Sequence, residues 1–83
     1  MTSPEICVTV DGRPRRLPAG ATVLRLVEDL TGAALTDSGV PADGRRLGVA
    51  VAVAGEVVPR GAWSAHVLSD GAVVDVVTAA QGG

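Results

Sequence analysis

The strongest constraint on the fold is a strand–turn–strand pattern near the N-terminus. Residues 6–10 alternate between apolar and smaller side chains, which is typical of a half-buried β-strand. Asp11-Gly12 follows at once, and this dipeptide favours a tight hairpin turn in which both residues have positive φ. Residues 13–17 are therefore predicted to pair back as a second strand. Because Pro14 has no N–H for a ladder, we expect that strand at an edge of the sheet.

A short helix is predicted after this hairpin. Thr22 is a suitable N-cap, because its hydroxyl can accept a hydrogen bond from a free amide of the first helical turn. Apolar residues then recur at helical spacing, and Gly32 is a natural stop. A helix this short is marginal alone, so we expect it to rest on the sheet. Further segments are predicted beyond it: strands over 48–54, 56–58 and 72–77, and an irregular or helical segment over 60–66.

The order of these segments favours an α+β fold in which one helix covers one face of a sheet. After a hairpin and a helix, the final strand can enter beside the first one in parallel, which is the β-grasp (ubiquitin-like) arrangement. We therefore expect a mixed sheet of about four to five strands, one main covering helix and a flexible C-terminal tail. The residues predicted to form the core share an inward-facing spacing: Val8, Val10, Val23, Leu26, Val27, Leu30, Val51, Val53, Val74 and Val76.

Two segments leave their role open at this stage. Residues 33–46 contain Asp, Ser, Gly and Pro and predict a long loop, which is either a functional segment or, the interpretation we favour, a tolerated insertion. The predicted strand over 48–54 has valines on one face and small apolar residues on the other. That second face, formed by Ala50, Ala52 and Ala54, is either a plain solvent-facing surface or part of a partner-docking patch.

Composition excludes several classes of function. The chain has 83 residues, nine acidic and seven basic side chains and a net charge of −2, so no basic stripe for nucleic acid is expected. All basic residues are arginines, which excludes a phosphate-binding loop that needs lysine. Cys7 is the only cysteine, so neither an internal disulfide nor a multi-cysteine metal site is expected. Without a signal-like or membrane-spanning segment, we expect a cytoplasmic protein that does not contact a membrane.

Three side chains invite a functional interpretation but have simpler ones. Cys7 lies within an alternating strand, so we expect an ordinary small side chain rather than a sulfur relay. His66 could act as a general base, but Cys7 lies about 60 residues away in the sequence, and a catalytic pair of the two is not expected. Trp63 is interpreted as a core or rim anchor beside Pro59. The Asp11-Gly12 dipeptide is interpreted as a turn and nothing more.

The C-terminal end of the chain is the most informative segment. We expect residues 1–77 to form the domain and residues 78–83, Thr-Ala-Ala-Gln-Gly-Gly, to form a flexible tail of small side chains. A terminal glycine carboxylate has no side chain beside it, so it can pass along a narrow channel. An ordinary carboxylate is ionised near neutrality and is a poor electrophile. It becomes reactive only when a partner converts it to an acyl-adenylate.

A string of residues in the second half of the chain has an order and a distance from the terminus that are specific to one family. It consists of Gly55-Glu56-Val57-Val58-Pro59-Arg60, Trp63, Leu68, Asp70-Gly71, Val76-Val77 and Gly82-Gly83. With this string the chain resembles the β-grasp sulfur carriers, most closely the ThiS family of thiamine biosynthesis. The resemblance is dense from residue 53 and weak over residues 1–47. The departures are Ala54 in place of a common Asn, Ala72 in place of a common acid, and a longer 33–46 loop.

The resemblance implies a protein that is acted upon and is not itself an enzyme. An E1-like, ThiF-like enzyme would use its own ATP and Mg²⁺ to adenylate Gly83, with Gln81 and Gly82 occupying that partner's channel. A persulfide sulfur donor would then yield a thiocarboxylate, from which a ThiG-like thiazole synthase takes the sulfur. No cofactor or metal is expected on this chain. Two alternatives remain open: a carrier for molybdopterin or a secondary metabolite, and a β-grasp interaction module that carries no sulfur.

Overall fold

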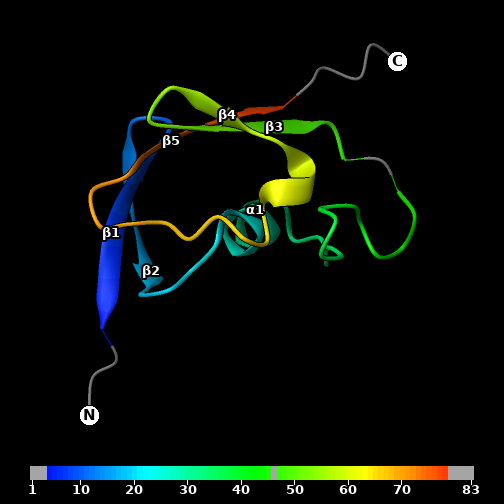
Figure 1. Cartoon of the computed structure of the whole chain (residues 1–83), viewed down its shortest axis with the longest axis horizontal. Coiled ribbons are helices and arrows are strands. Elements are labelled where there is room, and N and C mark those ends of the chain that lie inside the picture. The colour runs from blue at the N-terminus through cyan, green and yellow to red at the C-terminus, as the bar shows by residue number, and fades with distance from the viewer. Residues whose placement is uncertain (1–3, 46, 79–83) are drawn as a thin grey trace.

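The computed structural model describes residues 4–45 and 47–78 of the chain. In these residues five strands, one α-helix and one 3₁₀-helix are formed (Figure 1). In chain order they are β1 (Glu5–Val10), β2 (Arg13–Pro18), α1 (Val23–Thr31), β3 (Val49–Val53), β4 (Glu56–Val58), the 3₁₀-helix η1 (Arg60–Ala62) and β5 (Val73–Thr78). The predicted elements are therefore present, with boundaries that shift by one or two residues.

The strands form a single mixed sheet in the order β2-β1-β5-β3-β4. The last strand, β5, lies in the centre, parallel to β1 and antiparallel to β3, while the remaining neighbours are antiparallel. Helix α1 lies against one face of this sheet (Figure 1). This is the predicted α+β, β-grasp architecture, and it places the strand that leads to the C-terminus between the two halves of the sheet.

The N-terminal hairpin forms as its turn dipeptide predicts. Asp11 and Gly12 have φ values of 50° and 83°, which is the pair of positive angles that a two-residue hairpin loop needs. The strands pair in register from Glu5 with Pro18 to Val10 with Arg13. β2 lies at the edge of the sheet, where the missing N–H of its internal proline removes no ladder bond to a further strand.

Helix α1 begins and ends at the predicted residues. The Thr22 hydroxyl accepts a hydrogen bond from the Arg25 amide at 3.2 Å, and Gly32 adopts the left-handed conformation and donates its amide to the Glu28 carbonyl. The prediction that Leu30 belongs to the core is wrong, because 39% of this residue is exposed. Leu30 lies in the last helical turn, where it lines an open surface groove beside the β1–β2 hairpin.

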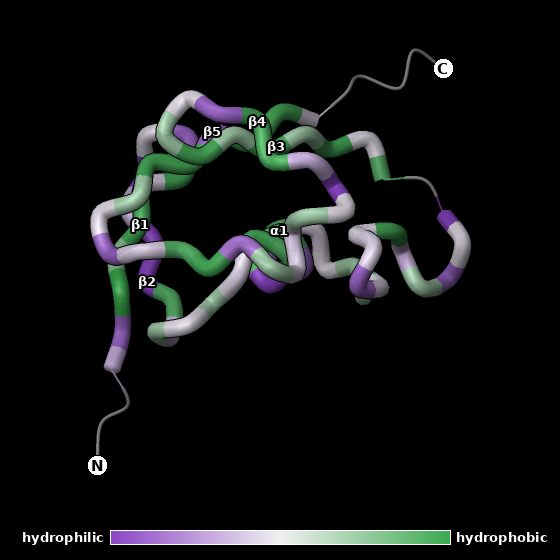
Figure 2. Tube along the Cα trace, viewed as in Figure 1, coloured by the Kyte–Doolittle hydropathy of each residue, from purple (hydrophilic) through white to green (hydrophobic). Residues whose placement is uncertain are grey.

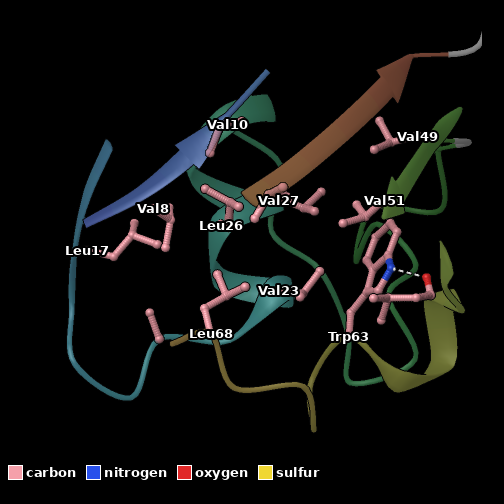
Figure 3. Packing of buried hydrophobic residues seen from close by; sticks show 13 residues of the cluster. Val8, Val10, Leu17, Val23, Leu26, Val27, Val49, Val51, Trp63 and Leu68 are labelled. Atoms are coloured by element: carbon pink, nitrogen blue, oxygen red, sulfur yellow. Dashed lines mark hydrogen bonds between the residues drawn. The ribbon is translucent and has the colours of Figure 1, made fainter. Parts of the chain in front are cut away.

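The core lies between α1 and the sheet and is built almost entirely of valine and leucine (Figure 3). Of the ten predicted core residues, seven are buried, and Val53 and Val76 are partly buried against the cluster. The sequence pattern did not include several members of the core, such as Leu17 of the edge strand β2, Val58 of the short strand β4, and Leu68 between η1 and β5. The buried residues are Val8, Val10, Leu17, Ala21, Val23, Leu26, Val27, Val49, Val51, Val58, Trp63, Leu68 and Val74.

Trp63 is the largest fully buried side chain, which confirms its interpretation as a core anchor. Its indole Nε1 donates a hydrogen bond to the Val58 carbonyl at 2.9 Å, so burial leaves no polar atom unpaired (Figure 3). The Arg60 guanidinium lies over the indole ring, 4.8 Å from the ring centroid. One aromatic residue therefore closes the end of a core that contains no Phe or Tyr.

The loop after α1 is attached to the sheet by the same arginine. The Arg60 guanidinium donates hydrogen bonds to the carbonyls of Gly39 at 2.8 Å, Leu47 at 2.5 Å and Val49 at 3.2 Å. Gly39 is buried with a φ of 79°, and a Cβ there would collide with Arg60. Within the described part of the predicted loop, Gly39 and Pro41 are thus buried, while most of the other residues stay exposed.

Two predicted boundaries need correction. Ala54 is not a strand residue: with a φ of 52° it forms the tight β3–β4 turn together with Gly55. Thr78, assigned by the sequence to the tail, is the last residue of β5 and pairs with Val49 of β3. In both cases the antiparallel partner sets where the strand ends, and small or polar residues alone do not reveal such a partner.

Candidate functional site

Strand β5 positions the chemically important end of the chain. It is held by β1 on one side over Thr9–Val73 and Val10–Val74, and by β3 on the other side as far as Thr78. The predicted reactive Gly83 and the predicted channel residues Gln81 and Gly82 lie outside the described residues. Thr78, the last described residue of β5, pairs with Val49, the first residue of β3.

Two aspartate side chains extend the short parallel ladder between β1 and β5. At the start of β5, the Asp70 carboxylate accepts a hydrogen bond from the Cys7 amide at 2.7 Å. At its end, the Asp11 carboxylate accepts one from the Val76 amide at 2.9 Å. In a continued parallel ladder the main-chain carbonyls of these aspartates would occupy those positions. The interpretation of Asp11-Gly12 as a turn and nothing more is therefore incomplete, because the Asp11 carboxylate also binds the Val76 amide of β5.

The face of the sheet that α1 does not cover carries an apolar surface, which we call the outer apolar face. Its apolar members are Ala50 and Ala52 of β3, Val57 of β4, and Val73 and Val77 of β5. One charged side chain lies among them, because the exposed Asp75 alternates with Val73 and Val77 along β5 and pairs with Ala52. Strand register brings them together, since Ala50 pairs with Val77 and Ala52 pairs with Val57. Figure 2 shows β3 and β5 as hydrophobic along most of their length, as expected for strands that are apolar on both faces.

This face includes two of the three predicted docking residues and adds three that the sequence analysis missed. Val57 and Val77 are 74% and 63% exposed, which is unusual for valines in paired strands. Ala54 does not belong to the face, because it lies in the β3–β4 turn. Alternation along β5 and the β3–β4 pairing would have revealed the missed valines, but only once the strand register was known.

A family model described as the ThiS family matches residues 8–83, which is most of the chain. This chain belongs to the ThiS family. Its architecture agrees with a solved structure of thiamine biosynthesis protein ThiS from Geobacter metallireducens, with 30% sequence identity and a TM-score of 0.61. The likeness covers 94% of this chain and 100% of that one. Among curated protein sequences, none is significantly similar.

The ThiS family consists of small β-grasp carrier proteins. The other candidate side chains of this member lie on β1 and after η1. Cys7 is an exposed thiol on β1, and its only polar contact is 4.0 Å from Sγ to the Val8 carbonyl. His66 follows η1, and its main-chain carbonyl accepts a hydrogen bond from the Val23 amide. Neither side chain forms part of a catalytic arrangement in the residues that the structure describes.

Metal binding and membrane crossing find no support in the described part of this ThiS-family chain. Within residues 4–45 and 47–78, no group of three or more His, Cys, Asp or Glu side chains could hold a metal ion. Among the same residues, no helix combines the length and the apolar character that crossing a membrane requires.

Proposed function

We propose that this protein is the sulfur carrier of thiamine thiazole synthesis, with Gly83 as the residue that bears the sulfur. The observation that carries the proposal is the family match, which spans residues 8–83 and so includes Gly82-Gly83. The structural likeness to a thiamine biosynthesis protein over nearly the whole chain supports the same pathway. The central position of β5 supports a design in which a rigid domain presents the end of the chain to other proteins.

The proposed chemistry begins with adenylation in the active site of an E1-like, ThiF-like enzyme. A Gly83 carboxylate oxygen attacks the α-phosphorus of ATP, and pyrophosphate leaves, which gives a mixed anhydride with AMP. The ATP and its Mg²⁺ belong to that enzyme, so the carrier contributes the carboxylate and the residues that guide it. Glycine suits this role because no side chain crowds the acyl carbon.

Sulfur transfer then replaces AMP. The terminal sulfur of a donor persulfide attacks the acyl carbon and displaces AMP, leaving an acyl disulfide between carrier and donor. A thiol cleaves the S–S bond and becomes part of a new disulfide, so the carrier is released as the thiocarboxylate. A ThiG-like thiazole synthase is the proposed acceptor of this sulfur, after which the carrier returns to the carboxylate form.

The outer apolar face is the proposed docking surface for the adenylating enzyme. It lies on the same sheet as the end of β5, with Val77 one residue before the last described residue of that strand. Ala50 and Ala52 add small side chains that allow a partner to approach closely. A partner that covers this face would bind the sheet and the departing chain together, which gives the apolar exposure a function.

The test is ATP–pyrophosphate exchange by the ThiF-like enzyme, with the parent chain compared with a chain that lacks Gly83. Removing one residue moves the carboxylate back by about 3.3–3.6 Å, enough to miss an adenylation centre. We expect exchange with the parent and none with the shortened chain, both melting at the same temperature. Labelled persulfide sulfur should then pass through the parent into the thiazole. Normal exchange by the shortened chain would refute the proposal.

A further inference from the structure

We infer that Asp11 is a positioning residue for sulfur loading, because its carboxylate fixes the end of β5 from which the reactive terminus departs. The inference rests on the proposed function and adds to it a residue more than seventy positions away in the sequence. Asp11 lies in the hairpin turn, touches none of the reacting atoms and would act only through the strand that carries them.

The argument begins with how β5 is held. On the β3 side the strand is paired as far as Thr78. On the β1 side the ladder reaches Val10 with Val74, and then β1 turns away at Asp11-Gly12. Without another acceptor, the Val76 amide would face open space on that side. The last part of β5 would then be held by one neighbour only.

Asp11 supplies that acceptor and also donates a second hydrogen bond to β5. Its own amide donates to the Val74 carbonyl at 2.9 Å, and its carboxylate oxygen accepts from the Val76 amide at 2.9 Å. Because Asp11 already has the φ of 50° that begins the turn, a side-chain oxygen takes the place that a strand residue would fill with its carbonyl. Val76 is thereby the last point at which β5 is held from both sides.

This placement matters because Val77 follows Val76 directly and Gly82-Gly83 comes five residues after Val77. A partner that binds the outer apolar face contacts Val77, so its binding depends on how Val77 is oriented. The same partner must also accommodate the chain that continues from Thr78. If the end of β5 frays, the partner has to restore its order on binding, at the expense of affinity. A net hydrogen bond of ordinary strength corresponds to about a fivefold change in an equilibrium constant.

Asp70 provides a matched control. It makes the same kind of bond, carboxylate to strand amide, at 2.7 Å to Cys7, but at the opposite end of β5. Asp70→Ala should therefore lower stability about as much as loss of the Asp11 carboxylate, without altering the end of β5. For Asp11 itself, Asp11→Gly removes the carboxylate and tolerates the positive φ, while Asp11→Asn keeps a side-chain oxygen and also tolerates it.

The experiment measures KM and kcat for the parent and the three variants in ATP–pyrophosphate exchange by the ThiF-like enzyme. We expect Asp11→Gly to raise KM about fivefold with kcat nearly unchanged, and both Asp11→Asn and Asp70→Ala to keep the parent's KM. Amide hydrogen exchange supplies a second readout that does not depend on the enzyme. The Val76 amide should lose protection in Asp11→Gly alone, while Asp70→Ala should release the Cys7 amide.

The outcomes separate this inference from the proposed function. If the parent supports exchange but Asp11→Gly and Asp70→Ala have the same KM, the positioning role is wrong and the carrier function stands. An Asp11→Asn variant as impaired as Asp11→Gly would also overturn it, because the side-chain oxygen would then not be the active feature. If the parent supports no exchange at all, both the carrier function and the positioning role fail.

Discussion

At the scale of single residues, polar side chains make the long-range connections of this fold. Asp11, Asp70 and Arg60 each bond main-chain atoms that are distant in the sequence. Such bonds replace ladder partners or satisfy carbonyls in and after the loop that follows α1. Their geometry depends on the finished fold, so the sequence shows only that a charged residue lies in a turn or follows a proline.

Loss of the Arg60 guanidinium should destabilise the protein. Arg60→Met keeps the apolar stem over Trp63 but removes the bonds to three carbonyls, and we expect a loss of about 2–3 kcal/mol. Arg60→Lys should be intermediate, because it keeps the charge but lacks the planar fork. The control is Arg25→Met, which breaks only the exposed pair with Asp29 and should cost about 0.5 kcal/mol or less. Equal melting temperatures for the two Met variants would contradict this account.

Cys7 should be dispensable for sulfur transfer. Its thiol is exposed on β1 and makes only the weak contact with the Val8 carbonyl, so replacing sulfur by oxygen should leave the fold intact. Cys7→Ser is expected to be converted to the thiocarboxylate at the parent's rate, as measured by intact mass after reaction with the activating enzyme. A folded Cys7→Ser protein that accepts no sulfur would instead make this residue a sulfur relay.

At the scale of elements, local signals were sufficient for most of the fold. Asp11-Gly12 determines the hairpin, and Thr22 and Gly32 limit the helix, because each acts within a few residues of itself. Burial was harder to predict. Leu30 has the helical spacing of a core residue, yet it lies in the last turn, where the groove beside the hairpin stays open. The outer apolar face depends on strand register, which only the assembled sheet defines.

Two of the three leucines of α1, Leu26 and Leu30, allow a matched test of this distinction. Leu26 is fully buried between helix and sheet, whereas Leu30 is 39% exposed on the same helix. Leu26→Ala should lower the free energy of unfolding by about 2–5 kcal/mol, since it removes buried methyl groups and leaves a cavity. Leu30→Ala should cost roughly 1 kcal/mol or less, because less apolar surface is lost. Urea denaturation measures both, and similar losses for the two variants would argue against the described packing.

At the scale of the whole molecule, the two faces of one sheet have different tasks. α1 and the core cover one face and supply the stability, while the outer apolar face remains without a cover among the described residues. Strand β5 belongs to both, because Val74 is buried in the core and Val77 is exposed on the outer side. The strand that stabilises the domain is thus also the strand that orients the end of the chain toward a partner.

A charge on the outer apolar face should impair docking without affecting folding. Ala50→Glu places a carboxylate opposite Val77, where a partner that buries the face would have to desolvate it. We expect KM in ATP–pyrophosphate exchange to rise by about tenfold or more, which corresponds to at least 1.4 kcal/mol of binding. Ala19→Glu, on the exposed turn after β2, is the control and should behave as the parent. An unchanged KM for Ala50→Glu would mean that the partner binds elsewhere.

The central claim is that sulfur is carried at the C-terminal carboxyl of Gly83. It is tested most directly by fragmenting the intact protein in a mass spectrometer after reaction with the activating enzyme, ATP and a persulfide donor. The account predicts that one oxygen is replaced by sulfur, and that the change lies in the C-terminal fragment that ends at Gly83. Sulfur found in the N-terminal fragment that contains Cys7, or a chain that takes up no sulfur at all, would contradict the account.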